Sequence, residues 1–156
     1  MTVTPLVIHE RKGTWGRQLR PRVAGWPIRP VETRSEADLV AAARLHPFPL
    51  AVFDLSERQV SILADLATFL DHSPRAISLV LDPAKIPEAA EIAWECGATL
   101  VRSGLTRPPE VMDLLAHWSA LSRQRADADG WFPADPADED DPYLGFAALT
   151  PPAGFP

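Results

Sequence analysis

Cysteine is almost missing from this sequence: Cys96 is the single thiol among 156 residues. One cysteine cannot form an internal disulfide, which argues against a small disulfide-stabilised domain. Long apolar runs are missing too, and the opening stretch, MTVTPLVIHERKG, lacks the apolar length that a signal peptide or a membrane span requires. These absences predict a soluble cytoplasmic protein with no membrane partner.

The common nucleotide-binding and catalytic motifs are also missing. The sequence has neither GxGxxG after its first apolar run nor GxxxxGK[S/T], the glycine-rich loops that hold cofactor or nucleotide phosphates. It has no GxSxG motif to position a nucleophilic serine. His46, His72 and His117 do not have the helical spacing of two zinc-binding histidines. We therefore predict no enzyme, no catalytic residue, no cofactor and no dedicated metal site.

Positive charge is not in excess, since the chain carries a formal net charge of −6. Residues 127–156 hold seven Asp or Glu and no Lys or Arg, which leaves residues 1–126 with 15 basic and 14 acidic side chains. Five basic residues without an acid do lie between Arg11 and Arg22, but no nucleic-acid recognition motif accompanies them. We predict no nucleic-acid partner, and a contact with an acidic peptide or protein is the better interpretation of this stretch.

The change in composition after residue 126 divides the chain. Residues 1–126 predict one domain of ordinary size. Residues 127–156 predict an acidic tail with six prolines, because a chain of one charge sign with few branched apolar residues does not offset the entropy of ordering and favours disorder. Its aromatic residues leave two alternatives, a segment that folds against a partner and one that docks weakly on its own domain. Opposite charge predicts a weak contact with the Arg11–Arg22 stretch.

Short apolar runs alternate with helical patterns along the domain. The runs lie at residues 6–10, 27–32, 50–54, 76–82 and 98–103. Such alternation predicts a parallel sheet covered by helices. The last three runs are nearly continuous in Val, Ile, Leu and Phe, which is typical of strands buried on both faces. Pro27 and Pro30 remove ladder donors from the second run, so we expect that strand at an edge of the sheet.

Helix signals follow each run. Ser35 and Ser56 each stand before a helical apolar spacing and are predicted N-caps, with Gln59 completing a capping box for Ser56. Pro21 should break or shorten the first helix. Five strands and five helices in this order predict an α/β, flavodoxin-like, five-stranded parallel sheet of order 2-1-3-4-5 with helices on both faces.

Four stretches carry a family resemblance: LVIHE at 6–10, LAVFDLS at 50–56, AISLVLD at 76–82 and CGATLVRSGLTRPPEV at 96–111. Through them the chain resembles a response-regulator receiver domain over roughly residues 5–124. The resemblance gives Asp54, at the end of the third strand, the position of the receiver's phosphoacceptor. It also implies that the chain is a degenerate receiver of the pseudo-receiver type, because the residues around Asp54 depart from the family's pattern.

The departures affect each group that supports phosphotransfer in the family. His9 and Glu10 stand where receivers have two acids that bind magnesium, so one oxygen ligand is replaced by an imidazole. Asp82 stands in place of a Ser or Thr, and Arg102 or Ser103 in place of the fifth-strand lysine. The resemblance thus predicts a vestigial acidic site made of Glu10, Asp54, Asp82, His9, Arg102 and Ser103.

Losing several of the groups that bind magnesium or neutralise the phosphoryl oxygens should impair phosphoryl transfer severely. We therefore expect a structural role for Asp54 and a module that acts in signalling or regulation by protein–protein interaction. The resemblance places the unknown protein partner on the face formed by the fourth helix, fifth strand and fifth helix. Two alternatives remain: a response-regulator receiver that is still phosphorylated on Asp54, and a small-ligand site at the carboxyl edge of the sheet, which rests on fold analogy alone.

Overall fold

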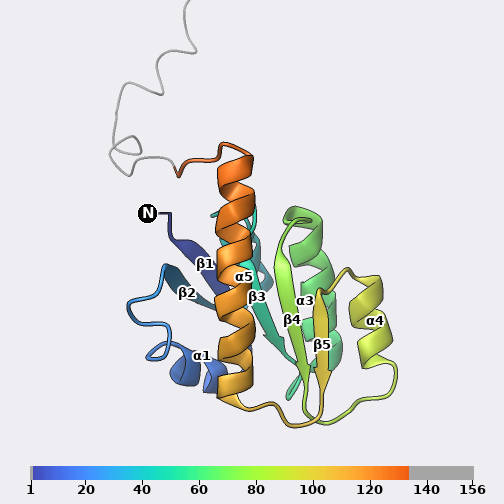
Figure 1. The fold of residues 1–156 in the computed structure, drawn as a ribbon. Coiled ribbons are helices and arrows are strands. Elements are labelled where there is room, and N and C mark those ends of the chain that lie inside the picture. The colour runs from blue at the N-terminus through green and yellow to red at the C-terminus, as the bar shows by residue number, and fades with distance from the viewer. Residues whose placement is uncertain (1, 134–156) are drawn as a thin grey trace, which may run out of the picture.

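A computed structural model describes residues 2–133 of the chain. Its centre is a five-stranded parallel sheet of order β2-β1-β3-β4-β5, as the sequence predicted (Figure 1). The strands are β1 (Thr4–His9), β2 (Ile28–Thr33), β3 (Leu50–Asp54), β4 (Ile77–Asp82) and β5 (Leu100–Ser103). The predicted disorder of the acidic tail falls almost entirely on residues 134–156, which lie outside the described residues.

Helices cover both faces of the sheet. They are α1 (Thr14–Leu19), α2 (Glu36–Ala43), α3 (Gln59–His72), α4 (Ala89–Glu95) and α5 (Pro108–Ala128). Apolar side chains of α2, α3 and α4 form one core, and those of α1 and α5 form the other. Figure 1 shows α5 lying across the sheet on the face that it shares with α1. The order and layers are those of the flavodoxin-like fold, which confirms the predicted fold class.

Alternation along the strands divides side chains between these two cores. In β1, Val7 packs in the core under α2, α3 and α4, whereas Leu6 and Ile8 pack in the core under α1 and α5. All six residues of β1 and of β4 are buried. Because both faces are covered, neither face of these strands tolerates a run of polar residues, which explains the apolar runs at residues 6–8 and 79–81. The proline-bearing strand β2 lies at an edge, as predicted.

The helix starts confirm one predicted cap and contradict another. Ser35 Oγ accepts the Asp38 backbone N–H at 3.2 Å, so Ser35 is the N-cap of α2. The capping box at Ser56 was wrong: α3 begins only at Gln59, after Arg58 in a left-handed conformation. The Ser56 hydroxyl instead donates to the Asp54 carboxylate. A hydroxyl that donates to a carboxylate makes a charge-assisted hydrogen bond, which is stronger than a neutral cap bond and holds Ser56 beside the end of β3.

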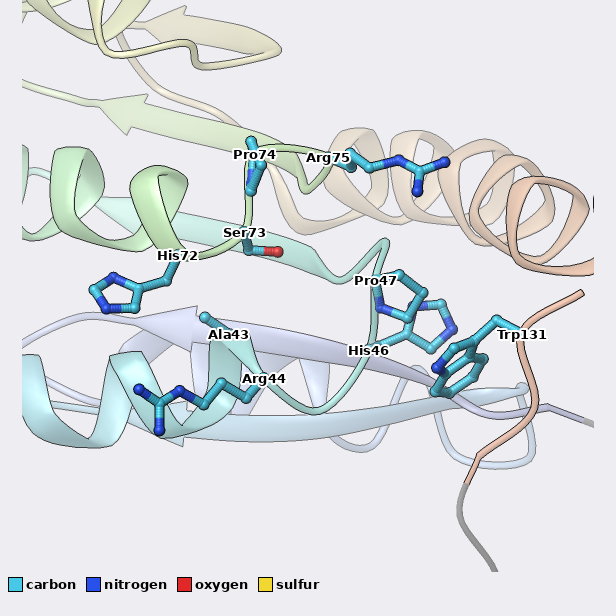
Figure 2. A pocket seen from close by; sticks show the side chains of 9 residues that line it. All are labelled: Ala43, Arg44, His46, Pro47, His72, Ser73, Pro74, Arg75 and Trp131. Atoms are coloured by element: carbon cyan, nitrogen blue, oxygen red, sulfur yellow. The ribbon is translucent and has the colours of Figure 1, made fainter. Parts of the chain in front are cut away.

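Helix α5 continues through the predicted domain boundary at residue 126. Ala126 is fully buried, and Asp129 pairs with Arg75 at 2.5 Å. Trp131 then packs against the ring of His46, with 4.3 Å between centroids and an interplanar angle of 64° (Figure 2). Contacts with the domain therefore extend to Trp131, into the segment that composition assigned to the tail.

Candidate functional site

Three carboxylates lie at the carboxyl ends of neighbouring strands. Glu10 follows β1, Asp54 ends β3 and Asp82 ends β4, and the sheet register pairs Asp54 with Leu81. The three residues are buried, with exposed fractions of 2%, 6% and 1%. The parallel sheet thus brings all three acids of the predicted vestigial site to one edge, because strands 1, 3 and 4 are adjacent.

The carboxylate of Glu10 holds the start of α1. Its Oε2 accepts the Trp15 N–H at 3.0 Å, and its Oε1 accepts the Gly16 N–H at 2.9 Å. Backbone N–H groups in the first turn of a helix have no partner within the helix, so a buried carboxylate stabilises them. Both oxygens of Glu10 are therefore occupied by local backbone.

Asp82 forms a turn at the end of β4. Both of its carboxylate oxygens accept the Ile86 N–H, at 3.1 and 2.9 Å. Its backbone carbonyl accepts the Gly104 N–H at 2.8 Å and so also ties the loop after β5 to β4. A side-chain oxygen that accepts a nearby backbone N–H is the usual way in which Asp shapes a turn. Asp82 thus builds the β4–α4 loop.

Asp54 differs from these two acids because it lines a pocket. The pocket has a volume of about 110 Å³ and is also lined by Trp15, Leu81, Gly104 and Thr106, among others. Within residues 2–133 no backbone N–H donates to the Asp54 carboxylate, whose partner is the Ser56 hydroxyl. Asp54 is therefore both a turn residue and the acid that faces the hollow.

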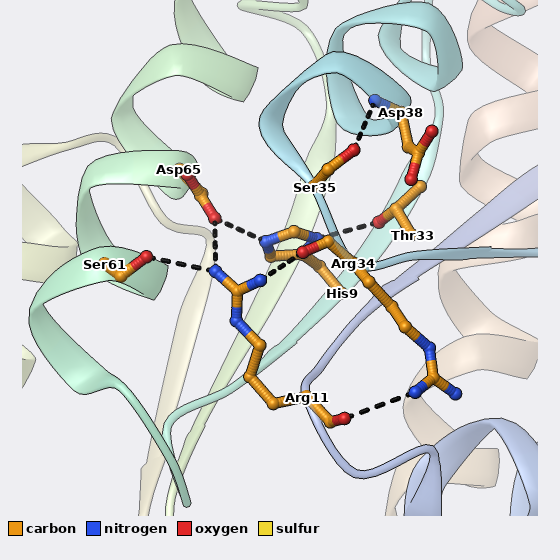
Figure 3. A network of polar contacts seen from close by, with 8 residues as sticks. All are labelled: His9, Arg11, Thr33, Arg34, Ser35, Asp38, Ser61 and Asp65. Atoms are coloured by element: carbon orange, nitrogen blue, oxygen red, sulfur yellow. Dashed lines mark hydrogen bonds and ion pairs between the residues drawn. The ribbon is translucent and has the colours of Figure 1, made fainter.

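His9 points away from the three carboxylates, into the core under α2 and α3. Its Nε2 lies 2.7 Å from Asp65 Oδ2 and its Nδ1 lies 2.8 Å from Thr33 Oγ1 (Figure 3). A carboxylate only accepts, so Nε2 carries the proton and Nδ1 accepts from the Thr33 hydroxyl. Burial lowers the pKa of His9, and Asp65 partly offsets that effect. His9 is thus a neutral core residue, separated from the acids that sequence reasoning grouped with it.

Asp65 on α3 is the buried acid that sequence reasoning missed. In addition to His9, it pairs with Arg11 at 3.4 Å, and the same guanidinium donates to Ser61 Oγ at 3.0 Å (Figure 3). The sequence does contain a signal for this buried acid, because Asp65 lies between Ile62 and Leu66, two buried residues of the apolar face of α3. An acid on an apolar helix face is buried when the helix packs, and a buried charge is stable only with a hydrogen-bonding or ionic partner.

Arg102 and Ser103 lie on β5, the edge strand beside β4, and both are exposed. Neither lines the pocket at Asp54. A cation from another element lies near its rim: a Cβ added to Gly104 would stand 3.0 Å from Lys85 Cε and 3.8 Å from its Nζ. Gly104 has φ +91, which a residue with a side chain rarely adopts. A lysine beside this pocket thus comes from the β4–α4 loop.

The metal that receivers hold beside their phosphoacceptor does not fit this edge. Both oxygens of Glu10 accept N–H groups, and His9 is turned into the core. Within residues 2–133, no group of three His, Cys, Asp or Glu side chains is arranged to hold a metal ion. Two of the three carboxylates at this edge, those of Glu10 and Asp82, accept backbone N–H groups instead of serving as oxygen ligands.

Comparison with solved structures identifies the architecture, with 59 chains matching. A CheY-like response-regulator receiver domain from Methanospirillum hungatei aligns with a TM-score of 0.67 and 10% identity, over 80% of this chain and 99% of that one. The chain has the receiver-domain fold. A response regulator from Burkholderia pseudomallei, solved with a phosphorylated aspartic acid, calcium ion and citrate, aligns with a TM-score of 0.61 and 17% identity, over 79% of this chain and 73% of that one.

A third similar structure is a putative pilus assembly protein, CpaE, from Burkholderia thailandensis. It has a TM-score of 0.58 and 16% identity, over 76% of this chain and 99% of that one. At these identities the likeness is one of fold. No protein-family model and no curated protein matches the sequence. Within the described residues, no helix has the length and apolarity to cross a membrane.

Proposed function

We propose that this receiver-fold chain is a signalling or regulatory module that acts by binding another protein and has no efficient phosphotransfer. The observation that carries the proposal is the surroundings of Asp54. Asp82 places a buried carboxylate at the neighbouring strand end, where the family has a neutral hydroxyl residue, and Glu10 is used to hold α1. Asp54 is left without the groups that would make it reactive.

Electrostatics gives the physical reason. In phosphoryl transfer nearly all of the catalysis comes from positioning and from neutralising charge on the transferring oxygens. At this edge two further buried acids flank Asp54, and the strand β5 presents Arg102 toward solvent. A phosphoryl group arriving at Asp54 would therefore meet negative charge without a fixed cation that lines the pocket.

The face formed by α4, β5 and α5 supports the binding role. On α4, Trp94 is 48% exposed and Ile92 41% exposed, although both are large apolar side chains. Beside them β5 is an edge strand that carries the exposed Arg102, and Leu105 in the next loop is 95% exposed. Tryptophan and arginine are enriched at the centres of protein interfaces. We assign the partner surface to this face.

Phosphorylation is tested by incubating the full chain with acetyl phosphate and magnesium and measuring intact mass. The expected result is no adduct on the wild-type chain. The matched control is Asp54→Asn, which removes the acid at the receiver's phosphoacceptor position. An adduct on the wild-type chain that Asp54→Asn abolishes would overturn the claim that phosphotransfer is lost.

The binding face is tested by capture of partners from a lysate with the full chain, comparing two tryptophan variants. Trp94→Ala should reduce capture of the specific partner at least tenfold. Trp26→Ala, a residue that is 36% exposed and precedes the opposite edge strand β2, should leave capture unchanged. Equal losses in both variants would place the partner elsewhere.

One observation favours the alternative, a receiver still phosphorylated on Asp54: Lys85 lies beside Gly104, which lines the same pocket as Asp54. In that alternative the Lys85 ammonium replaces the fifth-strand lysine. The two candidates are separated by Lys85→Gln, which should abolish an adduct if one forms and should leave partner capture unchanged.

A further inference from the structure

The described part of the chain ends at Pro133, close to Trp131 and to the amino ends of the strands. Two hollows of about 330 Å³ each flank this side chain. One is lined by Arg44, His46, His72 and Arg75, and the other by Arg29 and Pro133, among others (Figure 2). We call the surface formed by Arg29, Arg44, His72 and Arg75 the amino-end basic surface.

Two contacts hold Trp131 against the domain. The Trp131 N–H donates to the Ala126 carbonyl at 3.0 Å, and its ring packs on His46. His46 is 2% exposed and accepts the Phe48 N–H at Nδ1, so its proton is on Nε2. That N–H has no hydrogen-bond partner within the described residues. A buried donor without an acceptor is costly.

Charge at the amino-end basic surface is unbalanced. Neither hollow is lined by an acidic residue among those the structure describes. Arg75 already pairs with Asp129, and the guanidinium holds the pKa of that carboxyl below its usual range. Arg29 and Arg44 are exposed, and no carboxylate within residues 2–133 forms an ion pair with either of them.

The sequence that follows Pro133 supplies the missing charge. Residues 134–141 read ADPADEDD, with five acids and no basic residue. An extended chain spans about 3.3–3.6 Å per residue, so Asp135 reaches about 7 Å from Pro133 and Asp141 about 28 Å. Pro133 itself lines one of the hollows. The acids are thus tethered within reach of both hollows, where a short linker gives a local concentration on the order of millimolar.

We propose that residues 135–141 of this chain bind back onto the amino-end basic surface, with their carboxylates paired to Arg44 and Arg29 on either side of Trp131. The other basic stretch, Arg11–Arg22, is a poorer partner than the sequence alone suggested. Several of its cations are already used, by Asp65, Glu57 and Glu32. That stretch also lies at α1, at the opposite end of the sheet from the end of α5 (Figure 1).

This inference concerns a different end of the molecule from Asp54 and does not depend on the proposed partner face. Its consequence is regulatory: bound acids keep other anionic groups away from Arg44 and Arg29. A tail so placed also extends the anchored part of the chain beyond Trp131.

The test uses the full chain with one spin label on the tail. Ala137→Cys is introduced together with Cys96→Ala, so that a nitroxide can be attached at residue 137 alone. Amide signals of Arg44, His46 and Ser73 should be broadened at least twofold at low salt. The broadening should vanish at 1 M salt, where the Debye length is about 3 Å.

Charge variants in the same labelled chain give the matched comparison. Arg29→Gln with Arg44→Gln should abolish the broadening. Arg102→Gln, which removes an exposed arginine from β5, should leave it unchanged. All three side chains are exposed, so the fold should tolerate the changes. The comparison of broadening at low and high salt, made in the labelled chain with all its arginines, tests the contact without any charge variant.

Three results would overturn the proposal. Broadening confined to the Arg11–Arg22 stretch would move the contact to the other end of the sheet. A second sample mixes spin-labelled chain at natural isotope abundance with nitrogen-15-enriched chain that carries no spin label. Broadening in this sample would show that the contact forms between two copies of the chain. No broadening of any domain signal would mean that the acids face solvent.

Discussion

Replacing Asp65 with asparagine should lower the free energy of unfolding by about 1–2 kcal/mol. The Asp65 carboxylate accepts the His9 Nε2–H at 2.7 Å, and its side chain is only 8% exposed. Hydrogen bonds to a charged group contribute about 1.5–3 kcal/mol and neutral ones about 0.5–1.5 kcal/mol, so removing the charge while keeping the shape loses roughly the difference. The loss of the Arg11 ion pair adds to this, although that pair is longer, at 3.4 Å.

Urea unfolding followed by tryptophan fluorescence measures the effect, with an unchanged slope showing that the unfolded state is the same. The matched control is Asp71→Asn, an exposed acid on the same helix, which should change stability by less than about 0.5 kcal/mol. His9→Phe supplies the second arm of a double-mutant cycle, because a ring at this position still packs against Phe53. The coupling between positions 9 and 65 should be at least about 0.5 kcal/mol.

Two results would refute the reasoning. If Asp65→Asn and Asp71→Asn cost the same, the buried carboxylate would contribute no more than a surface charge. If the two changes at positions 9 and 65 were additive, the short contact seen between the side chains would carry no energy of its own, and His9 would be held by packing alone.

Two further predictions concern pH and the start of α1. Burial lowers the pKa of both His9 and His46 below their ordinary value of 6.5, so the unfolded state takes up protons first as the pH falls. Stability should therefore be complete above about pH 6.5 and should decrease below it; a urea midpoint no lower at pH 5 than at pH 8 would contradict this. Glu10→Gln should cost about 0.5–2 kcal/mol, because a neutral amide replaces the carboxylate that accepts the Trp15 and Gly16 N–H groups. The measurement is again urea unfolding, and an unchanged midpoint would show that α1 does not need the charge.

Much of the fold was readable because its signals are local. A strand covered on both faces must be apolar throughout, so β3 and β4 were evident from their composition. Pro30 marked β2 as an edge strand, since proline removes a ladder donor. The position of Asp54 at the carboxyl end of β3 followed from the same pattern.

The partners of the polar side chains were decided by tertiary structure. Ser56 fitted a capping pattern in sequence, yet its hydroxyl donates to Asp54, because a carboxylate at the strand end lies within its reach. His9 and Glu10 are adjacent in sequence, but successive side chains along a strand point to opposite faces of the sheet. His9 therefore lies in the core under α2 and α3, whereas Glu10 accepts N–H groups at the start of α1.

Asp65 and Trp131 illustrate the same limit at greater distance. Asp65 meets His9 across 56 positions of sequence, and no local pattern names that partner. Composition placed Trp131 in an acidic tail, whereas helix α5 carries it to His46 at the far end of the sheet. By itself the sequence determined the order of strands and helices, because periodicity and turn chemistry are local. Only the folded chain decided which buried charge meets which donor, because that depends on faces and distances that the packing of separate elements creates.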